Sequence, residues 1–366
     1  MKRGLLPFLF MCILLVGVAD AQIEPHFTQY MYNQYLFNPA YAGSNDALDF
    51  SALYRSQYVN LSNRPISDLG FNFNMPVYSI SSGVGLTVVN DVIGYERSTY
   101  ASLTYDYRKR FKWGNFSIGA NIGLIQASLD GAQLTTSSGT YGTGERNNND
   151  PDVPTTLQNG ISPDLSIGTY LNKEDKYFVG LSLQHIIASS APIETPQKKI
   201  TLDFTRDLYL SGGYNFRISP KFMVMPSAII QTDFTEMQTD FSVMTTIVNN
   251  ILAGISFRGY DGRSLDALAL IIGFRIRGFQ AMYSYDASLS YLSNFSSGSH
   301  EVTLKYNYEL KSKKNQGYYY HNPRYNLWVL TADTKQIEMK NVINIRNKVF
   351  FSNTFVKTKT GYIYAL

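Results

Sequence analysis

The side chains that most often bind metals or perform catalysis are few in this sequence and lie far apart. The chain has four histidines without the spacing of a metal site: His26, His185, His300 and His321. A hydrogen-bonded or exposed histidine explains each of them better than a ligand does. No serine elbow and no Cys/His pair indicates a nucleophile. We therefore expect a protein that is not an enzyme and needs no metal or cofactor.

Two polar stretches have the composition of binding loops but not the required context. GTYGTG at 139–144 is rich in glycine, yet no predicted strand precedes it and no predicted helix follows it. It therefore does not fit a phosphate-binding loop. NNNDPD at 147–152 offers oxygen ligands for calcium but lacks the EF-hand pattern, so we interpret it as a solvated surface loop.

The first 21 residues have the three parts of an export signal. A Lys-Arg pair precedes an apolar stretch from Leu5 to Val18, and Ala19-Asp20-Ala21 has the A-x-A form of a cleavage site. The apolar stretch is too short to serve well as a membrane-spanning helix. Cys12, the single cysteine, lies inside it. We expect a mature chain that begins at Gln22 and has no disulfide or free thiol.

The composition is unusual for a water-soluble protein. Charged residues make up 16% of the chain and aromatic residues 14%, with 28 Tyr against 2 Trp. A soluble domain would be expected to have about a quarter charged residues. Without the signal, 30 basic residues stand against 27 acidic ones, which is weak evidence for a nucleic-acid partner, and we expect none. The composition fits strands that turn one face toward lipid.

From Leu48 to Leu310, apolar residues alternate with small or polar ones, as in 116–124 and 301–309. A period of two places all apolar members of a segment on one face. Fourteen such segments begin near Leu48, Ile66, Gly83, Tyr100, Asn115, Asp164, Lys176, Asp207, Lys221, Gln238, Ile251, Leu265, Phe279 and His300.

Strands of about 10 residues with one apolar and one polar face are typical of an outer-membrane barrel. A soluble sandwich would also alternate, but here the polar face is rich in Gly, Ser and Asn rather than Lys and Glu. Connections after even-numbered segments are short, and those at 130–163 and 186–202 are long. We predict an all-β fold, a transmembrane antiparallel outer-membrane β-barrel of about 14 strands, closed because lipid cannot satisfy an open edge.

Side chains of this barrel would divide between its interior and its membrane interfaces. The candidates for a salt-bridged interior, which we prefer to a transport pathway, are Asp68, Asp106, Asp207, Glu301, Arg55, Arg108 and Arg217. The candidates for interfacial girdles are Tyr54, Tyr105, Tyr107, Tyr283 and Tyr285.

The predicted organisation has four parts. They are a signal peptide at 1–21, an irregular N-terminal periplasmic or plug segment at 22–47, the barrel at 48–310 and a C-terminal periplasmic tail at 311–366. The second part contains QIEPHFTQYMYNQYLFNPAYAG (22–43), which has neither helical nor strand periodicity. The alternation in the tail is patchy, so its structure is left open.

Several stretches carry a resemblance to a known family. PHFTQYM at 25–31 and NPAYAG at 38–43 precede YRSQ at 54–57, and GVGL (83–86), DVIG (91–94) and NPRY (322–325) follow. Together they resemble the PorP/SprF family, outer-membrane proteins of the type IX secretion and gliding machinery of the Bacteroidota. NPAYAG ahead of YRSQ is the most specific part. Tyr58 departs from a common Trp, Asn63-Arg64-Pro65 from a usual Gly-Ala-Pro, and the residues after Tyr325 go beyond the family's usual end.

The resemblance implies a non-enzymatic barrel that helps cargo, such as adhesins with a type B C-terminal domain, reach or stay on the cell surface. It also implies periplasmic type IX secretion components as partners, beside outer-membrane lipid. The residues expected to contact a partner or to plug the barrel, with both options open, are Pro25, His26, Phe27, Gln29, Tyr30, Asn38, Pro39, Tyr41, Tyr54, Arg55 and Gln57. A passive outer-membrane channel for small solutes is the alternative function.

Overall fold

The computed structural model describes residues 25–62, 66–141, 150, 153–173, 176–187, 190–194, 199–248, 250–260 and 264–310, with four short strands near the C-terminus. The predicted export signal, residues 22–24, residues 63–65, and most of the NNNDPD and NPRY stretches lie outside this part. Contacts divide the chain into two units, Met1–Leu310 and Lys311–Leu366. In the second unit β18 (Tyr319–Asn322) pairs with β19 (Leu327–Leu330), and β20 (Val356–Thr358) with β21 (Gly361–Ile363).

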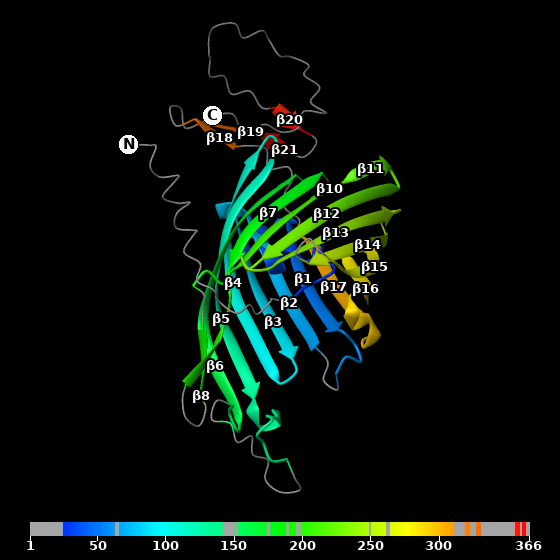
Figure 1. The fold of residues 1–366 in the computed structure, drawn as a ribbon. Coiled ribbons are helices and arrows are strands. Elements are labelled where there is room, and N and C mark those ends of the chain that lie inside the picture. The colour runs from blue at the N-terminus through cyan, green and yellow to red at the C-terminus, as the bar shows by residue number, and fades with distance from the viewer. Residues whose placement is uncertain are drawn as a thin grey trace, which may run out of the picture. The chain divides into compact units, whose positions relative to one another are not determined.

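In the described part of the first unit, fourteen antiparallel strands close into a ring (Figure 1). Its strands are β1 (Ala47–Gln57), β2 (Ile66–Val77), β3 (Ser82–Ile93), β4 (Glu96–Phe111), β5 (Gly114–Asp130), β6 (Leu157–Lys173), β7 (Tyr177–Gln184), β10 (Asp207–Tyr214), β12 (Phe222–Thr232), β13 (Met237–Ile247), β14 (Ile251–Tyr260), β15 (Ser264–Ile276), β16 (Phe279–Ser288) and β17 (Ser299–Glu309). Neighbours in the chain are neighbours in the ring, and β1 pairs with β17 to close it. The predicted barrel and its strand count are confirmed.

The remaining elements are short. β11 (Phe216–Ser219) follows β10 and pairs with β12, and β8 (Ser190–Glu194) pairs with β9 (Lys199–Asp203) in a hairpin outside the ring. The helical elements are α2 (Gln34–Phe37) and the 3-10 helices η1 (Pro39–Tyr41), η2 (Tyr78–Ile80), η3 (Gly131–Gln133) and η4 (Tyr291–Asn294). No helix in the described residues is long and apolar enough to cross a membrane.

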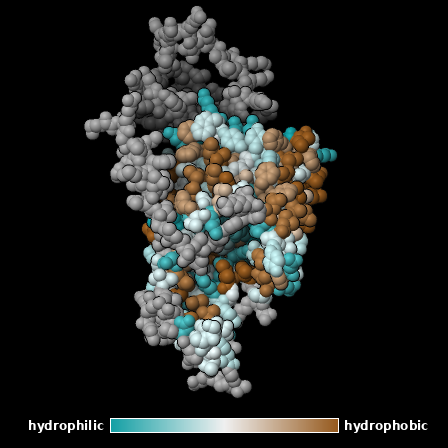
Figure 2. Space-filling view, in the orientation of Figure 1, coloured by the Kyte–Doolittle hydropathy of each residue, from teal (hydrophilic) through white to brown (hydrophobic). Residues whose placement is uncertain are grey.

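The ring has an apolar outer face and a polar inner face. On β5, Ile118 and Ile122 are 56% and 72% exposed, whereas Ser117 and Asn121, which directly precede them, are buried. Neighbouring strands repeat this pattern, and Figure 2 shows apolar side chains over much of the barrel surface. A soluble protein does not expose so continuous an apolar surface, so this face is solvated by lipid.

The pattern reverses near one end of the ring. On β5 beyond Leu124, the buried inward residues are Ile125 and Ala127, and the exposed outward residue is Gln126. Ile125 and Ala127 pack with Ala191 of β8 in a small apolar core. The long connections lie at this end, which is the extracellular end in outer-membrane barrels. This end of β5 therefore has the polarity of a strand in a soluble domain.

Three details differ from the sequence-based predictions. β6 begins at Leu157 rather than near Asp164, because Asn159 stands between the outward Leu157 and Ile161 and interrupts the apolar alternation that marks the second half of the strand. The long connection at 186–202 contains most of the β8–β9 hairpin. Arg217 was predicted to line the interior, but it is exposed on β11, because the strand is interrupted at Asn215 and the alternation does not continue.

Candidate functional site: the segment inside the barrel

The residues before β1 form an irregular segment that lies inside the ring. We call residues 25–46 the lumen segment. It contains α2 and η1, and most of its side chains from Phe27 to Ala42 are buried. Because the helices are short, the segment depends on hydrogen bonds and packing against the inner faces of the strands.

The start of the lumen segment is held by a buried charge cluster. Glu301 on β17 accepts hydrogen bonds from the backbone N–H groups of Thr28 (2.8 Å) and Gln29 (3.0 Å). The Arg55 guanidinium on β1 lies 3.0 Å from the Glu301 carboxylate and 2.7 Å from that of Asp286 on β16. Arg55 also donates to the Thr28 hydroxyl at 2.9 Å. These side chains are buried, so water cannot replace a lost partner.

A second arginine extends this cluster. Arg258 on β14 donates from Nε to Asp240 on β13 and from Nη2 to the Thr28 hydroxyl, both at 3.1 Å. Its Nη1 lies 3.3 Å from the Asp286 carboxylate. Thr28 donates its own hydroxyl proton to Asp286 at 2.6 Å. The hydroxyl group of Thr28 therefore joins three strands of the wall, β1, β14 and β16, and its removal would take away a hydrogen-bond partner of both arginines and of Asp286.

The NPAYAG stretch fits against glycines of the wall. The Asn38 side chain accepts from the Ala40 N–H and donates to the Thr169 carbonyl on β6, both at 2.9 Å. A Cβ atom added to Gly119 on β5 would lie 2.6 Å from the Ala40 nitrogen, and one added to Gly168 on β6 would lie 2.2 Å from Asn38 Oδ1. Any side chain at these two positions would push the segment off the wall.

The end of the lumen segment is held through its backbone. Arg108 on β4 donates to the carbonyl oxygens of Gly43 (2.9 Å) and Ala42 (2.6 Å). The Gly43 N–H donates to Asn74 on β2 at 2.8 Å, and the φ angle of Gly43 is +66°, which favours glycine. The segment is thus held at both ends, by charges near the extracellular end and by backbone contacts near the short-turn end.

Tyrosines of the lumen segment bury their rings and satisfy their hydroxyl groups. The Tyr30 hydroxyl lies 3.1 Å from the hydroxyl of Ser227 on β12, and Tyr35 donates to Thr104 on β4 at 2.8 Å. Burial raises the pKa of Tyr35 to about 12, so its hydroxyl stays protonated and able to donate. Tyrosine suits this interior because it combines apolar area with one polar group.

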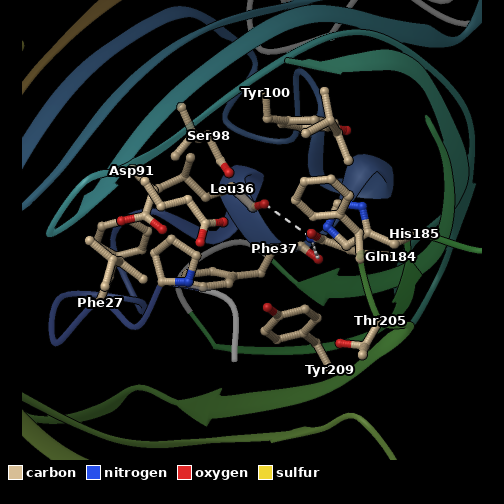
Figure 3. Close-up of a pocket in the computed structure, with 16 residues that line it drawn as sticks. Phe27, Leu36, Phe37, Asp91, Ser98, Tyr100, Gln184, His185, Thr205 and Tyr209 are labelled. Carbon is tan, nitrogen blue, oxygen red and sulfur yellow. Dashed lines mark hydrogen bonds between the residues drawn. The ribbon is translucent and has the colours of Figure 1, made fainter. Parts of the chain in front are cut away.

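A cavity remains beside the lumen segment. Its empty volume is about 860 Å³, part of which is open to solvent. Figure 3 shows it between the segment and the strands around it, with Gln184 donating to the backbone carbonyls of Leu36 and Phe37. The lining residues are Pro25, Phe27, Leu36, Phe37, Val89, Asp91, Ile93, Glu96, Ser98, Tyr100, Ile125, Gln184, His185, Phe204, Thr205 and Tyr209.

His26 lies next to the charge cluster. Burial, together with the nearby Arg258 and Arg55 cations, lowers its pKa from 6.5 to about 3. His26 is therefore neutral at pH 7. A neutral imidazole avoids a third positive charge beside two buried guanidinium groups.

Most of the predicted contact residues are brought together inside the ring. Pro25 lines the cavity, Phe27 packs on Phe37 with 6.1 Å between ring centroids, and Gln57 donates to Asp68 at 2.8 Å. Seven other predicted residues belong to the lumen segment or contact it: His26, Gln29, Tyr30, Asn38, Pro39, Tyr41 and Arg55. Whether any of them contacts a partner stays a prediction.

Tyr54 is the exception. It lies on the outer face of β1 and is 49% exposed, because Arg55 takes the inward position beside it. It therefore does not face the lumen segment, and whether it contacts a partner stays a prediction. Its outward position agrees with its other predicted place in an interfacial girdle.

Sequence reasoning missed several wall residues that hold the segment. They are Asp240, Arg258, Asp286 and Lys305, the last of which donates to the Tyr32 carbonyl at 2.6 Å. The alternation of inward and outward residues along their strands places all four on the inner face, so the sequence pattern alone could have predicted that they face the lumen. The alternation does not predict which of these side chains contact each other, because the contacts join strands that are far apart in the sequence.

The comparisons with known proteins agree with this fold. The model of the family described as type IX secretion system membrane protein PorP/SprF matches residues 19–306. No curated protein matches the chain.

Solved structures resemble the chain at a distance. Omp33, an outer membrane protein of Acinetobacter baumannii, has a TM-score of 0.40 and 8% identity over 72% of this chain and 99% of its own. The Ralstonia pickettii toluene transporter TbuX has a TM-score of 0.44 and 11% identity over 75% of this chain and 92% of its own. The monoaromatic hydrocarbon channel CymD has a TM-score of 0.43 and 11% identity over 80% of this chain and 95% of its own. Likenesses this distant say nothing of function. The family match covers most of the chain and the ring of strands fits it, so the protein belongs to the PorP/SprF family of type IX secretion system membrane proteins and is an outer-membrane β-barrel.

Proposed function

We propose that this barrel is a non-enzymatic accessory of type IX secretion that helps cargo with a type B C-terminal domain, such as an adhesin, reach or stay on the cell surface. The family match supports a place in that machinery. The observation that carries the proposal is the lumen segment, which fills part of the barrel and is hydrogen-bonded at both ends. A barrel occupied by its own chain is suited to binding rather than to free diffusion.

The lumen segment would then serve as a platform for partners at both ends of the barrel. At the short-turn end, Asp46 is about a third exposed and lies 3.2 Å from the exposed Arg110. Charged groups at this rim are available for periplasmic components of the machinery. The aromatic and Asn residues of the segment combine contact area with hydrogen bonding, as interface residues often do.

A clean deletion of the gene tests this function. Labelling of intact cells, followed by quantitation of surface proteins, should show loss of one or a few type B cargo proteins while other secretion persists. Restoring the gene should restore those proteins. Normal surface display of every type B cargo in the deletion strain would contradict the proposal.

A passive channel for small solutes is the second candidate, and the cavity beside the lumen segment is the observation that favours it. Planar-bilayer recordings of the purified protein separate the two functions. The accessory function predicts a barrel that is silent or opens briefly. A steady open-pore conductance would favour the channel.

A further inference from the structure

The turn between β4 and β5 lies where the lipid-facing surface ends at the short-turn end of the barrel. On β4 the outward residues from Ala101 to Tyr107 are apolar or aromatic and exposed. The next outward residues are Lys109 and Phe111, and Lys112 and Trp113 form the turn itself. Short turns of outer-membrane barrels face the periplasm. The turn therefore lies at the depth of the lipid head groups of the periplasmic leaflet.

Two aromatic rings and two lysines gather at this turn. We call Lys109, Phe111, Lys112 and Trp113 the rim patch, and all four are exposed. Phe111 and Trp113 stack, with 4.8 Å between ring centroids and 8° between ring planes. The Lys109 ammonium group lies 5.5 Å from the centroid of the Phe111 ring. Aromatic rings of this kind gather at membrane–water interfaces, where a lysine extends its charged end toward the head groups.

The neighbouring strands hold the turn in place. The Tyr177 hydroxyl on β7 donates to the Trp113 carbonyl at 2.7 Å. A Cβ atom added to Gly114, at the start of β5, would lie 2.7 Å from the Asn172 carbonyl oxygen on β6. The backbone of the turn is thus packed against two neighbouring strands, and its side chains are presented from a fixed position.

The two lysines of the rim patch are not used to balance charges of the barrel. The carboxylate of Asp46 lies 3.2 Å from Arg110 and 3.5 Å from Arg108, both on the inward side of β4. Lys109 and Lys112 form no ion pair with a residue that the structure describes. Their charges are therefore available to a group outside the protein.

The other charges at the periplasmic end have mostly the same sign. Two acidic residues there are exposed in full or in part, Glu309 and Asp46, and the sequence adds Glu174 and Asp175 in the turn after β6. The exposed basic residues on the turns are Lys109, Arg110, Lys112, Lys176, Arg217, Lys221, Arg275 and Arg277. An excess of one sign creates a field that attracts the opposite charge, here an anion.

We propose that the rim patch binds the head group of an anionic phospholipid in the periplasmic leaflet of the outer membrane. Lys109 and Lys112 contact the phosphate, and the stacked rings of Phe111 and Trp113 lie against the upper part of the acyl chains. The patch continues the lipid-facing surface of β4 and points away from the barrel mouth, which favours lipid over a periplasmic protein. The inference does not depend on the proposed function, because it concerns the lipid around the barrel rather than the cargo.

Quenching of Trp113 fluorescence by brominated lipid tests the proposal. The full-length mature protein carries Trp328→Phe, so that Trp113 is its single tryptophan. It is reconstituted in vesicles of phosphatidylcholine and phosphatidylglycerol, with bromine on the acyl chains of one lipid or of the other. Bromine quenches by contact, so the two series give the relative affinity of the two lipids beside Trp113.

Phosphatidylglycerol should be preferred at this position by about fivefold or more, the effect of at least one lysine near an anionic head group. Equal affinity for the two lipids would overturn the proposal. A patch that serves an acidic protein instead would leave Trp113 in water, quenched by soluble iodide and by neither brominated lipid. That result would overturn the proposal as well.

Matched variants locate the charge that is responsible. Lys109→Gln should lower the preference, and Lys109→Gln with Lys112→Gln should bring the two affinities close to each other. Arg97→Gln removes one charge from the same face of β4 at the opposite end of the strand and should leave the preference unchanged. Lys109→Arg with Lys112→Arg keeps both charges and should keep the preference.

Heat-modifiable mobility in gels shows that each variant still forms a barrel. Should the Lys109→Gln/Lys112→Gln protein form a barrel and still prefer phosphatidylglycerol as strongly as the unaltered protein does, the rim patch is not the site. An equal loss of preference in Arg97→Gln and Lys109→Gln would assign the effect to the net charge of the barrel, which would also overturn the proposal.

Discussion

Arg55 and Glu301 face each other directly across the seam where the first and last strands of the ring meet, with 3.0 Å between Nη1 and Oε2. The same carboxylate accepts the N–H groups of Thr28 and Gln29. One buried ion pair therefore spans the seam of the barrel and also holds the start of the lumen segment. Buried charges of this kind are costly to leave without a partner.

Arg55→Ala should lower the free energy of unfolding by about 3–5 kcal/mol, because it leaves Glu301 and Asp286 as buried carboxylates without their shared cation. The measurement is denaturant unfolding in detergent, followed by the loss of heat-modifiable mobility. Tyr54→Ala, the adjacent and outward position, is the control and should change stability much less. Equal effects of the two substitutions would contradict the role given to Arg55.

Gly119→Ala should detach the NPAYAG stretch, because the new Cβ would lie 2.6 Å from the backbone nitrogen of Ala40. Hydrogen exchange of residues 38–43 should become faster, and bilayer recordings should show longer openings. Gly212→Ala is the matched control, since the nearest atom to its new Cβ is 3.6 Å away, an ordinary contact. Unchanged exchange in Gly119→Ala would show that this close approach does not hold the segment.

The outward residues of β5 offer a test of the lipid band. Ile122 is 72% exposed on the outer face, so Ile122→Lys should destabilise the barrel in lipid by about 2–4 kcal/mol. Gln126→Lys, on the same face of β5 but beyond Leu124, the last outward apolar residue of the strand, should have a much smaller effect. Reversible unfolding in lipid vesicles compares the two. Similar costs at both positions would place the band elsewhere.

Acidification should loosen the start of the lumen segment through His26. With its pKa at about 3 in the folded protein and 6.5 in the unfolded chain, His26 contributes stability that is complete above pH 6.5. That contribution is lost as the pH falls from 6.5 toward 3, at most about 2.7 kcal/mol by pH 4.5. Hydrogen exchange of residues 27–30 at pH 7.5 and 4.5, corrected for intrinsic rates, should show this loss.

The charge cluster also contains carboxylates, so the effect of His26 is measured by comparing two proteins. The quantity compared is the change in hydrogen exchange between pH 7.5 and 4.5 in the unaltered protein and in a His26 variant. His26→Gln keeps a neutral polar side chain and should show a smaller change in exchange between the two pH values. The same pH dependence in both proteins would assign the effect to other groups.

Much of this fold follows from the period of two, because lipid outside and polar side chains inside impose it on every strand. Strand starts at Ile66, Asp207, Ile251 and Phe279 were predicted at the observed residues. The pattern fails where the solvent changes. Past Leu124 the outward residue Gln126 is polar and the inward Ile125 is apolar, and at the start of β6 Asn159 interrupts the outward apolar residues.

The site was less accessible to sequence reasoning. The alternation along β1 and β16 places Arg55 and Asp286 on the inner face. Their contact with each other and with Thr28 depends on how the ring closes and on the path of a segment that has no periodicity. Glycines at 119 and 168 give a weak sign of close approach, since they face inward where a side chain was expected. The partner of that approach is visible only in the folded chain.

The N-terminal segment lies docked inside the closed ring, and an engineered disulfide would report this position directly. The Cγ of Asn38 lies 3.0 Å from the position of a Cβ on Gly168, so Cys side chains at both positions would be close enough to bond. Cys12 is replaced by Ala in this variant, and Asn38→Cys with Ala120→Cys, on the outer face, is the control. The account predicts a disulfide in Asn38→Cys/Gly168→Cys, seen as a reductant-sensitive mobility shift of unlabelled monomer, and none in the control. Two free thiols that both react with maleimide in a folded Asn38→Cys/Gly168→Cys barrel would contradict it.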